Sequence, residues 1–191
     1  LEQSPHTPYS KHTMNEKIKN YKELLKNYNE HTNIYSKNAY DKLDFHINDS
    51  LTLATIIGNT NITVIDLGSG SGLPTIPIAI TNPNNNIYAI ESKSRKSRFL
   101  EEAKQTLKLD NLTIINKNIT EWEPPQKADI ITAKAFGSPE KILRISKHLT
   151  KPNASIYIPI SQNQKESYET ETGISIVSRE TYIYAQLVIE I

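Results

Sequence analysis

Hydrophobic residues in the first part of the chain recur with the spacing of amphipathic helices. Apolar and aromatic residues lie on one stripe from Ile18 to Tyr28, which predicts a helix over residues 15–29. A similar pattern predicts a second helix from about residue 41 to residue 57. We expect these two helices to form an N-terminal extension, residues 14–60, that covers the main domain.

From residue 62 onward the pattern changes to short β-branched runs separated by helical stretches. The predicted strands are residues 63–67, 87–90, 112–115, 128–133, 154–158, 174–178 and 182–189, and the predicted helices are residues 75–81, 94–109 and 139–149. Strands that alternate with helices indicate a parallel sheet, and the last two runs indicate an antiparallel hairpin at its edge. This pattern resembles the layout of the class I methyltransferases. Residues 61–191 are therefore expected to form one Rossmann-like α/β domain with a seven-stranded sheet.

A glycine-rich segment follows the first predicted strand. The strand ends at Leu67, and Gly68, Gly70 and Gly72 precede the next helical pattern. Glycines let a ligand approach the backbone, and the helix that follows points free N–H groups toward it. About twenty residues later a second apolar run ends at Glu91, where nucleotide-binding α/β folds place a carboxylate on the ribose hydroxyls. These features predict a nucleotide pocket.

The glycine spacing indicates which nucleotide is bound. Dinucleotide folds use G-x-G-x-x-G beside a pyrophosphate, whereas this chain has G-x-G-x-G with Asp66 two residues before the first glycine. Such a loop suits S-adenosylmethionine, which has no phosphates but has an ammonium group that Asp66 could hold. Asn118, Ile119 and Thr120 follow the third strand, where polar groups could recognise the adenine ring. The alternative interpretation of the loop is a glycine turn that only joins strand to helix. The alternative for Asn118 is an ordinary turn asparagine.

Composition narrows the function classes. The chain contains no cysteine, which excludes disulfides, thiolate zinc sites and cysteine-held iron–sulfur clusters. It has no run of about 18 apolar residues and no secretory pattern, so we expect a soluble cytoplasmic protein with no membrane partner. Residues 1–13 precede the only methionine, Met14, without periodicity. They are interpreted as a disordered tail or a non-native addition.

The formal net charge is only +1, so nucleic-acid binding would require a local basic patch. Residues 93–108 carry six basic and two acidic side chains, and a second basic cluster lies within residues 141–151. Either cluster could engage RNA phosphates, or it could be a solvated helix face. His46 and His148 have no partners at metal-binding spacing, so no metal site is expected.

The segment from Val64 to Ile80 carries a specific resemblance. Its glycine loop, followed by Gly72-Leu73-Pro74-Thr75-Ile76-Pro77, resembles the signature of the bacterial 16S rRNA guanine-N7 methyltransferases, also called the glucose-inhibited division protein B family. Matching segments follow the family's order at Tyr28-Asn29, Asn33-Ile34, His46-Ile47-Asn48-Asp49-Ser50, Lys96-Ser97-Arg98-Phe99-Leu100 and Leu107-Lys108-Leu109-Asp110-Asn111. The resemblance covers about residues 28–138.

The resemblance implies a methyltransferase sheet with N-terminal helices and transfer of a methyl group to guanine N7. The positions that match the family's cofactor contacts are Gly68, Leu73, Ile119, Thr120 and Lys134. The family usually has arginine at the position of Lys134, and a lysine followed by glycine near Ile160 and Ser161. These departures bear on catalytic efficiency or on the exact target.

Guanine N7 carries an unprotonated lone pair, so its methylation needs positioning rather than a general base. Lys134, the catalytic candidate, could orient guanine O6 or the cofactor carboxylate; the alternative is a solvated lysine at a strand end. The expected partner is small-subunit ribosomal RNA or the assembling subunit, bound by a monomer. A nicotinamide-dependent oxidoreductase is a weaker interpretation because of the glycine spacing and Asp66. A non-enzymatic cofactor-binding assembly factor is the other alternative.

Overall fold

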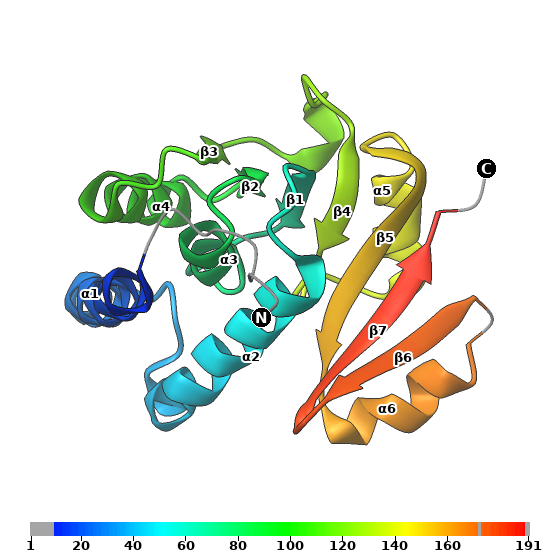
Figure 1. Cartoon of the computed structure of the whole chain (residues 1–191), viewed down its shortest axis with the longest axis horizontal. Coiled ribbons are helices and arrows are strands. Elements are labelled where there is room, and N and C mark those ends of the chain that lie inside the picture. The colour runs from blue at the N-terminus through cyan, green and yellow to red at the C-terminus, as the bar shows by residue number, and fades with distance from the viewer. Residues whose placement is uncertain (1–9, 172, 190–191) are drawn as a thin grey trace, which may run out of the picture.

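A computed structural model of the chain describes residues 10–171 and 173–189. Seven strands form one sheet with the order β3-β2-β1-β4-β5-β7-β6 (Figure 1). The strands are β1 Thr63–Leu67, β2 Asn86–Ile90, β3 Leu112–Ile115, β4 Ala128–Thr132, β5 Thr150–Ile160, β6 Ile174–Arg179 and β7 Tyr182–Val188. Strands β1 to β5 are parallel, whereas β7 is antiparallel to both β5 and β6. The predicted parallel sheet with a hairpin at one edge is confirmed.

Six α-helices and two 3₁₀ turns accompany the strands within the described residues. They are α1 Lys11–Glu30, η1 Lys37–Lys42, α2 Leu43–Ile57, α3 Thr75–Thr81, α4 Ser94–Leu107, η2 Ile119–Glu121, α5 Pro139–Ser146 and α6 Gln162–Glu169. Helix α1 begins earlier than predicted because the Ser10 side chain caps it, accepting from Thr13 N at 3.2 Å. A disordered tail is therefore wrong for residues 10–13, and residues 1–9 lie outside the described part.

Sequence periodicity did not predict α6, and it misplaced several boundaries. Helix α6 has no buried residue, so it lacks an apolar stripe, and it begins at a capping box formed by Ser161 and Gln164. Strand β5 is longer than the predicted residues 154–158 because it pairs with β4 on one side and β7 on the other. Helices α4 and α5 end two and three residues before their predicted ends.

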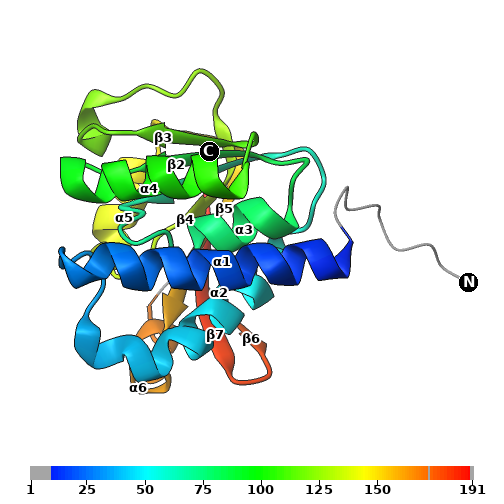
Figure 2. The ribbon, with the colours of Figure 1, turned by 90° about the vertical axis from the view of Figure 1, so that its left-hand side faces the viewer.

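Hydrophobic clusters cover both faces of the sheet. One contains residues of α1 to α4, including Tyr21, Leu53, Ile76 and Phe99, and the other contains residues of η2 and α5, including Ile142. Helix α1 lies along α4 on the first face (Figure 2). The two N-terminal helices therefore share one core with the α/β domain. Among the described residues, no helix has the length and apolar character needed to cross a membrane.

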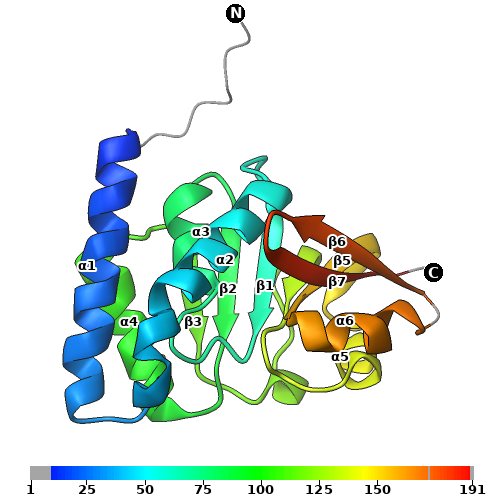
Figure 3. The ribbon, with the colours of Figure 1, turned by 90° about the horizontal axis from the view of Figure 1, so that it is seen from below.

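The direction in which successive strands are added to the sheet changes beside β1. It proceeds from β1 outward to β2 and β3, then returns to β4 on the other side of β1. The carboxyl ends of β1, β2 and β3 lie at one edge of the sheet (Figure 3). Loops that diverge at such a switch point open a crevice, which is where parallel α/β sheets bind their ligands.

Candidate functional site

The glycine loop after β1 requires glycine for two reasons. Gly68, Gly70 and Gly72 have φ values of +69°, +57° and +90°, which other residues rarely adopt. A Cβ atom at Gly68 would lie 2.8 Å from Cδ2 of Phe136, and one at Gly72 would lie 2.6 Å from Cδ1 of Ile76. The loop is therefore closely packed against other side chains of the protein at Gly68 and Gly72.

Asp66 supports this loop. The residue is 1% exposed, and its carboxylate accepts hydrogen bonds from the hydroxyls of Thr132, at 2.6 Å, and Thr75. Burial raises the pKa of Asp66, and the hydroxyl hydrogen bonds oppose this only in part. The side chain thus joins β1 to β4 and to the start of α3. The predicted contact of this buried carboxylate with an ammonium group stays a prediction.

The structure brings Glu91 to the glycine loop, at the end of β2. Its Oε2 accepts from Gly70 N at 3.0 Å and its Oε1 from Lys93 N at 2.8 Å, while its backbone carbonyl accepts from the Asn116 amide at 2.8 Å. An ionised carboxylate has about four acceptor positions, so two remain for hydroxyl donors. This arrangement suits the predicted contact with ribose.

The three residues predicted at the adenine ring lie at the same edge of the sheet. Asn118 caps η2, because its side-chain oxygen accepts from Thr120 N at 3.2 Å. These residues line a cleft of about 630 Å³, which also includes Phe136, Lys141 and Arg144. Ile119 is buried below it. Asn118 therefore behaves as a turn asparagine in the structure, beside a cavity large enough for a small ligand.

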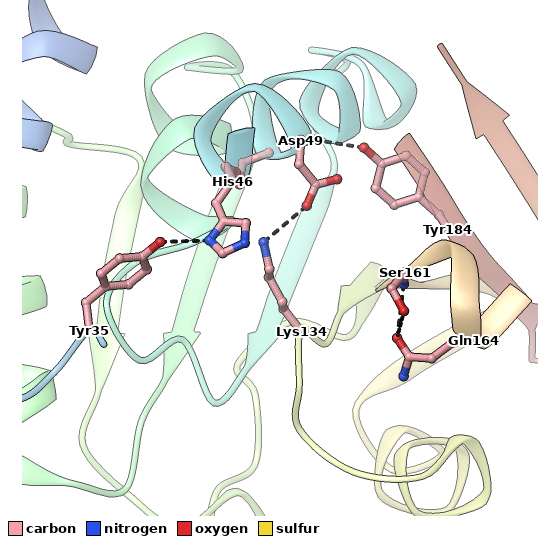
Figure 4. A network of polar contacts seen from close by, with 8 residues as sticks. Tyr35, His46, Asp49, Lys134, Ser161, Gln164 and Tyr184 are labelled. Carbon is pink, nitrogen blue, oxygen red and sulfur yellow. Dashed lines mark hydrogen bonds and ion pairs between the residues drawn. The ribbon is translucent and has the colours of Figure 1, made fainter. Parts of the chain in front are cut away.

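Lys134 is not a solvated lysine, so that alternative is wrong. Its Nζ lies 3.1 Å from Oδ2 of Asp49 on α2, and the two side chains are 23% and 10% exposed (Figure 4). Ala135 follows with a φ of +51°, a conformation that costs alanine energy. This turn allows Lys134 to contact α2 while Phe136 contacts Gly68.

Two tyrosines and a histidine surround this ion pair. Tyr184 of β7 donates to the backbone carbonyl of Asp49 at 2.8 Å, and the Tyr35 hydroxyl lies 2.8 Å from Nδ1 of His46 (Figure 4). Burial and the nearby charge of Lys134 lower the pKa of His46. Burial, together with the neighbouring Asp49, raises the pKa of Tyr184. Within residues 10–171 and 173–189, no group of three or more His, Cys, Asp or Glu could hold a metal ion.

Sequence reasoning missed some of these residues. Asp49 belongs to a segment that resembles the family, but the segment alone indicated no role for it. Phe136 and Tyr184 carried no signal because their contacts are with residues far away in the chain. The buried hydroxyl of Tyr21 on α1, which donates to the carbonyl of Ser71 at 2.8 Å, was also unexpected.

In each basic cluster, the structure exposes some side chains and packs or pairs others. Arg95 and Arg98 on α4 are exposed, whereas Lys96 is half-buried with its Nζ 3.7 Å from where a Cβ of Gly70 would lie. In the second cluster, Lys151 pairs with Asp129 at 2.8 Å. In the first cluster, Lys93, Arg95, Arg98 and Lys108 are therefore the exposed basic residues.

Comparison with known proteins gives consistent results. The family described as rRNA small subunit methyltransferase G matches residues 14–187. A Pseudomonas putida protein named ribosomal RNA small subunit methyltransferase G is 36% identical over 135 residues, covering 70% of this chain and 62% of that protein. A Nitrosomonas eutropha protein of the same name is 33% identical over 141 residues, covering 73% and 65%. The chain thus spans less than two thirds of the length of these relatives.

Solved structures share the fold at low identity. A putative S-adenosylmethionine-dependent methyltransferase from Methanococcus maripaludis matches with a TM-score of 0.61 and 15% identity, covering 99% of this chain and 98% of that one. An O-methyltransferase from Thermotoga maritima matches with a TM-score of 0.60 and 14% identity, covering 75% and 65%. The fold is that of the class I methyltransferases, as predicted.

Proposed function

Because the chain belongs to the rRNA small subunit methyltransferase G family, we propose that it transfers a methyl group from S-adenosylmethionine to N7 of a guanine in small-subunit ribosomal RNA. The observation that carries this proposal is the family match over residues 14–187, which includes the glycine loop and the carboxylate beside it. The methyl acceptor would reach the cofactor at the switch point of the sheet.

The residues at the switch point suit S-adenosylmethionine. Gly68 and Gly72 leave no room for a Cβ, and Glu91 lies across the loop with acceptor positions free for the ribose hydroxyls. The cleft lined by residues 118–120 would receive the adenine ring. The bound cofactor would supply a methyl group activated by its sulfonium.

Lys134 and its neighbours would orient the acceptor. N7 of guanine attacks with its own lone pair, so the protein needs to hold nucleophile and methyl group in line. Such orientation can supply about 7–11 kcal/mol of a reaction barrier. The Lys134 ammonium is fixed by Asp49 and by the strained Ala135, so little motion would be lost when a base binds.

The proposal also covers the substrate, the location and the oligomeric state of the protein. Its substrate would be small-subunit RNA, free or in an assembling particle, in the cytoplasm where ribosomes form. The protein would act as a monomer. Exposed Arg95 and Arg98 support RNA binding because they lie on the helix that begins beside the glycine loop.

Calorimetry and methyl transfer test the proposal in two stages. The full chain should bind S-adenosylmethionine, the demethylated product should compete, and NAD should not bind. Labelled methyl transfer is then measured on small-subunit RNA, with and without ribosomal proteins, and the modified base is located by cleavage at 7-methylguanosine. Cofactor binding without any transfer would favour a non-enzymatic assembly factor instead. NAD binding would favour an oxidoreductase.

A further inference from the structure

The Asp49–Lys134 ion pair joins helix α2 to the end of β4, next to the proposed methyl-acceptor site. The Asp49 side chain is 10% exposed and that of Lys134 23%. In contrast, the lysine–glutamate pair of Lys19 and Glu23 has side chains 75% and 60% exposed. Removing two charges from water costs several kcal/mol per ion, so a partly buried pair is weak evidence for a purely stabilising role.

The pair is also held in place by its surroundings. Tyr184 donates to the Asp49 carbonyl at 2.8 Å, and Ala135 with its φ of +51° directs the chain immediately after Lys134. An ionised carboxylate has about four acceptor positions, of which Lys134 uses one on Oδ2. The lysine ammonium has three donors. Both partners therefore keep hydrogen-bonding capacity for a third group while their positions are fixed.

A fixed donor next to a fixed acceptor is complementary to one edge of guanine. The Watson–Crick edge of guanine presents O6 as an acceptor and N1–H and the N2 amine as donors, and N7 lies beside O6 on the adjoining Hoogsteen edge. An ammonium at O6 leaves N7 free beside it, and a carboxylate at N1–H and N2 accepts both donors. Adenine carries an amine at the position of O6, so it would place a donor against the lysine.

We propose that Asp49 is a specificity-determining residue, whose carboxylate accepts N1–H and N2–H of the acceptor guanine while Lys134 donates to O6. This inference rests on the proposed function. Methyl transfer moves positive charge from the sulfonium to the base as the carbon–sulfur bond breaks and the bond to N7 forms. The charge of Lys134 alone would oppose that developing cation, and Asp49 neutralises it.

A purely structural tie between α2 and β4 is the competing explanation. The chain offers a matched control in Asp129 of β4, which pairs with Lys151 at 2.8 Å and also accepts from Thr63 N. Asp129→Asn breaks a lysine–aspartate pair between β4 and β5, near the start of β4 and away from the glycine loop. It should change stability without changing which base is used.

The experiment compares three bases at the acceptor position mapped for the wild type. Small-subunit RNA is ligated to carry guanosine, inosine or xanthosine at that position, in whichever state, free or assembled, supports transfer. Inosine lacks the N2 amine, so the wild type should methylate it at least about tenfold more slowly. Asp49→Asn should slow methyl transfer to guanosine by about tenfold or more. The variant should also methylate xanthosine faster relative to guanosine than the wild type does, because the asparagine amide can donate to the xanthine O2.

Each result either supports or overturns the role proposed for Asp49. Equal rates of methyl transfer to inosine and guanosine by the wild type would overturn the inference. An equal loss of rate on all three bases in the Asp49→Asn variant would also overturn it. If that variant does not fold, the wild-type comparison decides alone. Cofactor binding must stay unchanged in Asp49→Asn for its altered base preference to count as support. No transfer to guanosine RNA by the wild type would instead overturn the proposed function, and the inference with it.

Discussion

At the scale of single residues, the site depends on positions where backbone conformation and close packing coincide. Gly68 combines a φ of +69° with a neighbouring ring 2.8 Å from any added Cβ. Gly173 has a similar φ of +83° but nothing within 4 Å. The two glycines therefore separate the cost of the backbone conformation from the cost of the close approach.

Gly68→Ala should destabilise the protein more than Gly173→Ala and should weaken cofactor binding. Both variants lose about 1 kcal/mol of stability because alanine is strained in the left-handed conformation. Only Gly68→Ala loses a further amount of about 1–3 kcal/mol, because its Cβ overpacks against Phe136. Urea unfolding and S-adenosylmethionine titration measure the two effects. Equal losses in both variants would show that the ring of Phe136 moves aside without cost.

Asp66 should make stability depend on pH with a sign opposite to that of most carboxylates. Burial raises its folded pKa, so its contribution to stability is complete at low pH and is lost as pH rises from the ordinary carboxyl value through the raised one. Asp66→Asn should therefore gain stability relative to wild type as pH rises through that window, with a slope of at most about 1.4 kcal/mol per pH unit. Denaturant unfolding at several pH values measures this.

Asp129 provides the control with the reverse sign. Burial acts to raise the pKa of Asp129, but its hydrogen bonds to Lys151 and Thr63 N lower it overall. Its contribution is therefore present above the ordinary carboxyl value and lost as pH falls through the lowered one. Asp129→Asn should lose stability relative to wild type as pH rises. If both variants changed in the same direction, the assignment for Asp66 would be wrong.

At the scale of elements, helix α1 acts on the glycine loop from outside the α/β domain. Tyr21 is fully buried and its hydroxyl bonds the carbonyl of Ser71 at 2.8 Å. Tyr28 on the same helix makes a similar but exposed bond to the carbonyl of Arg95 at 3.2 Å. The N-terminal extension thus helps to fix the shape of the loop, although it lies far from it in sequence.

Tyr21→Phe should lower stability by about 1 kcal/mol and weaken S-adenosylmethionine binding several-fold. The loss arises because the Ser71 carbonyl loses its donor and the loop gains freedom. Tyr28→Phe, which removes an exposed hydroxyl, is the control and should change neither quantity appreciably. Thermal melting with and without cofactor measures both. An unchanged cofactor affinity in Tyr21→Phe would mean that the loop keeps its shape without the helix.

The elements themselves show what sequence can and cannot predict. Strong hydrophobic periodicity located all seven strands and five of the six described α-helices, because burial on a face imposes it. It missed α6, whose residues are polar and whose start depends on a local capping box. The glycine loop and Glu91 were predictable because their motif is local. The contact of Asp49 with Lys134 was not, because the fold joins residues 85 positions apart.

At the scale of the whole molecule, charge is nearly balanced, so the proposed RNA binding would have to come from a local surface. The formal net charge is +1, and Arg95 and Arg98 are exposed on α4. Lys96, which neighbours them in the basic segment of the sequence, lies against the glycine loop instead. The two arginines therefore provide a cleaner test of RNA binding than all three residues together.

Arg95→Glu with Arg98→Glu should weaken binding of small-subunit RNA and leave cofactor affinity unchanged. The slope of log K against log salt should become shallower by roughly 0.7–0.9 for each phosphate that the protein no longer neutralises. Lys165→Glu with Arg179→Glu, on α6 and β6, makes the same change in net charge and should have little effect. Filter binding at several salt concentrations measures this. Equal weakening in both double variants would indicate a general charge effect rather than an RNA surface.

The sheet order has a consequence for protein synthesis. Strand β7 follows β6 in the chain but lies between β5 and β6, and its Tyr184 reaches Asp49. During translation β6 can therefore pair with no other strand until almost every residue of the sheet has left the ribosome. A polypeptide interrupted before Tyr182 would carry the complete glycine loop but would lack the hydrogen bond from Tyr184 to Asp49. The contact of Tyr184 with Asp49, on which the proposed base selection would depend, is therefore among the last to form during synthesis.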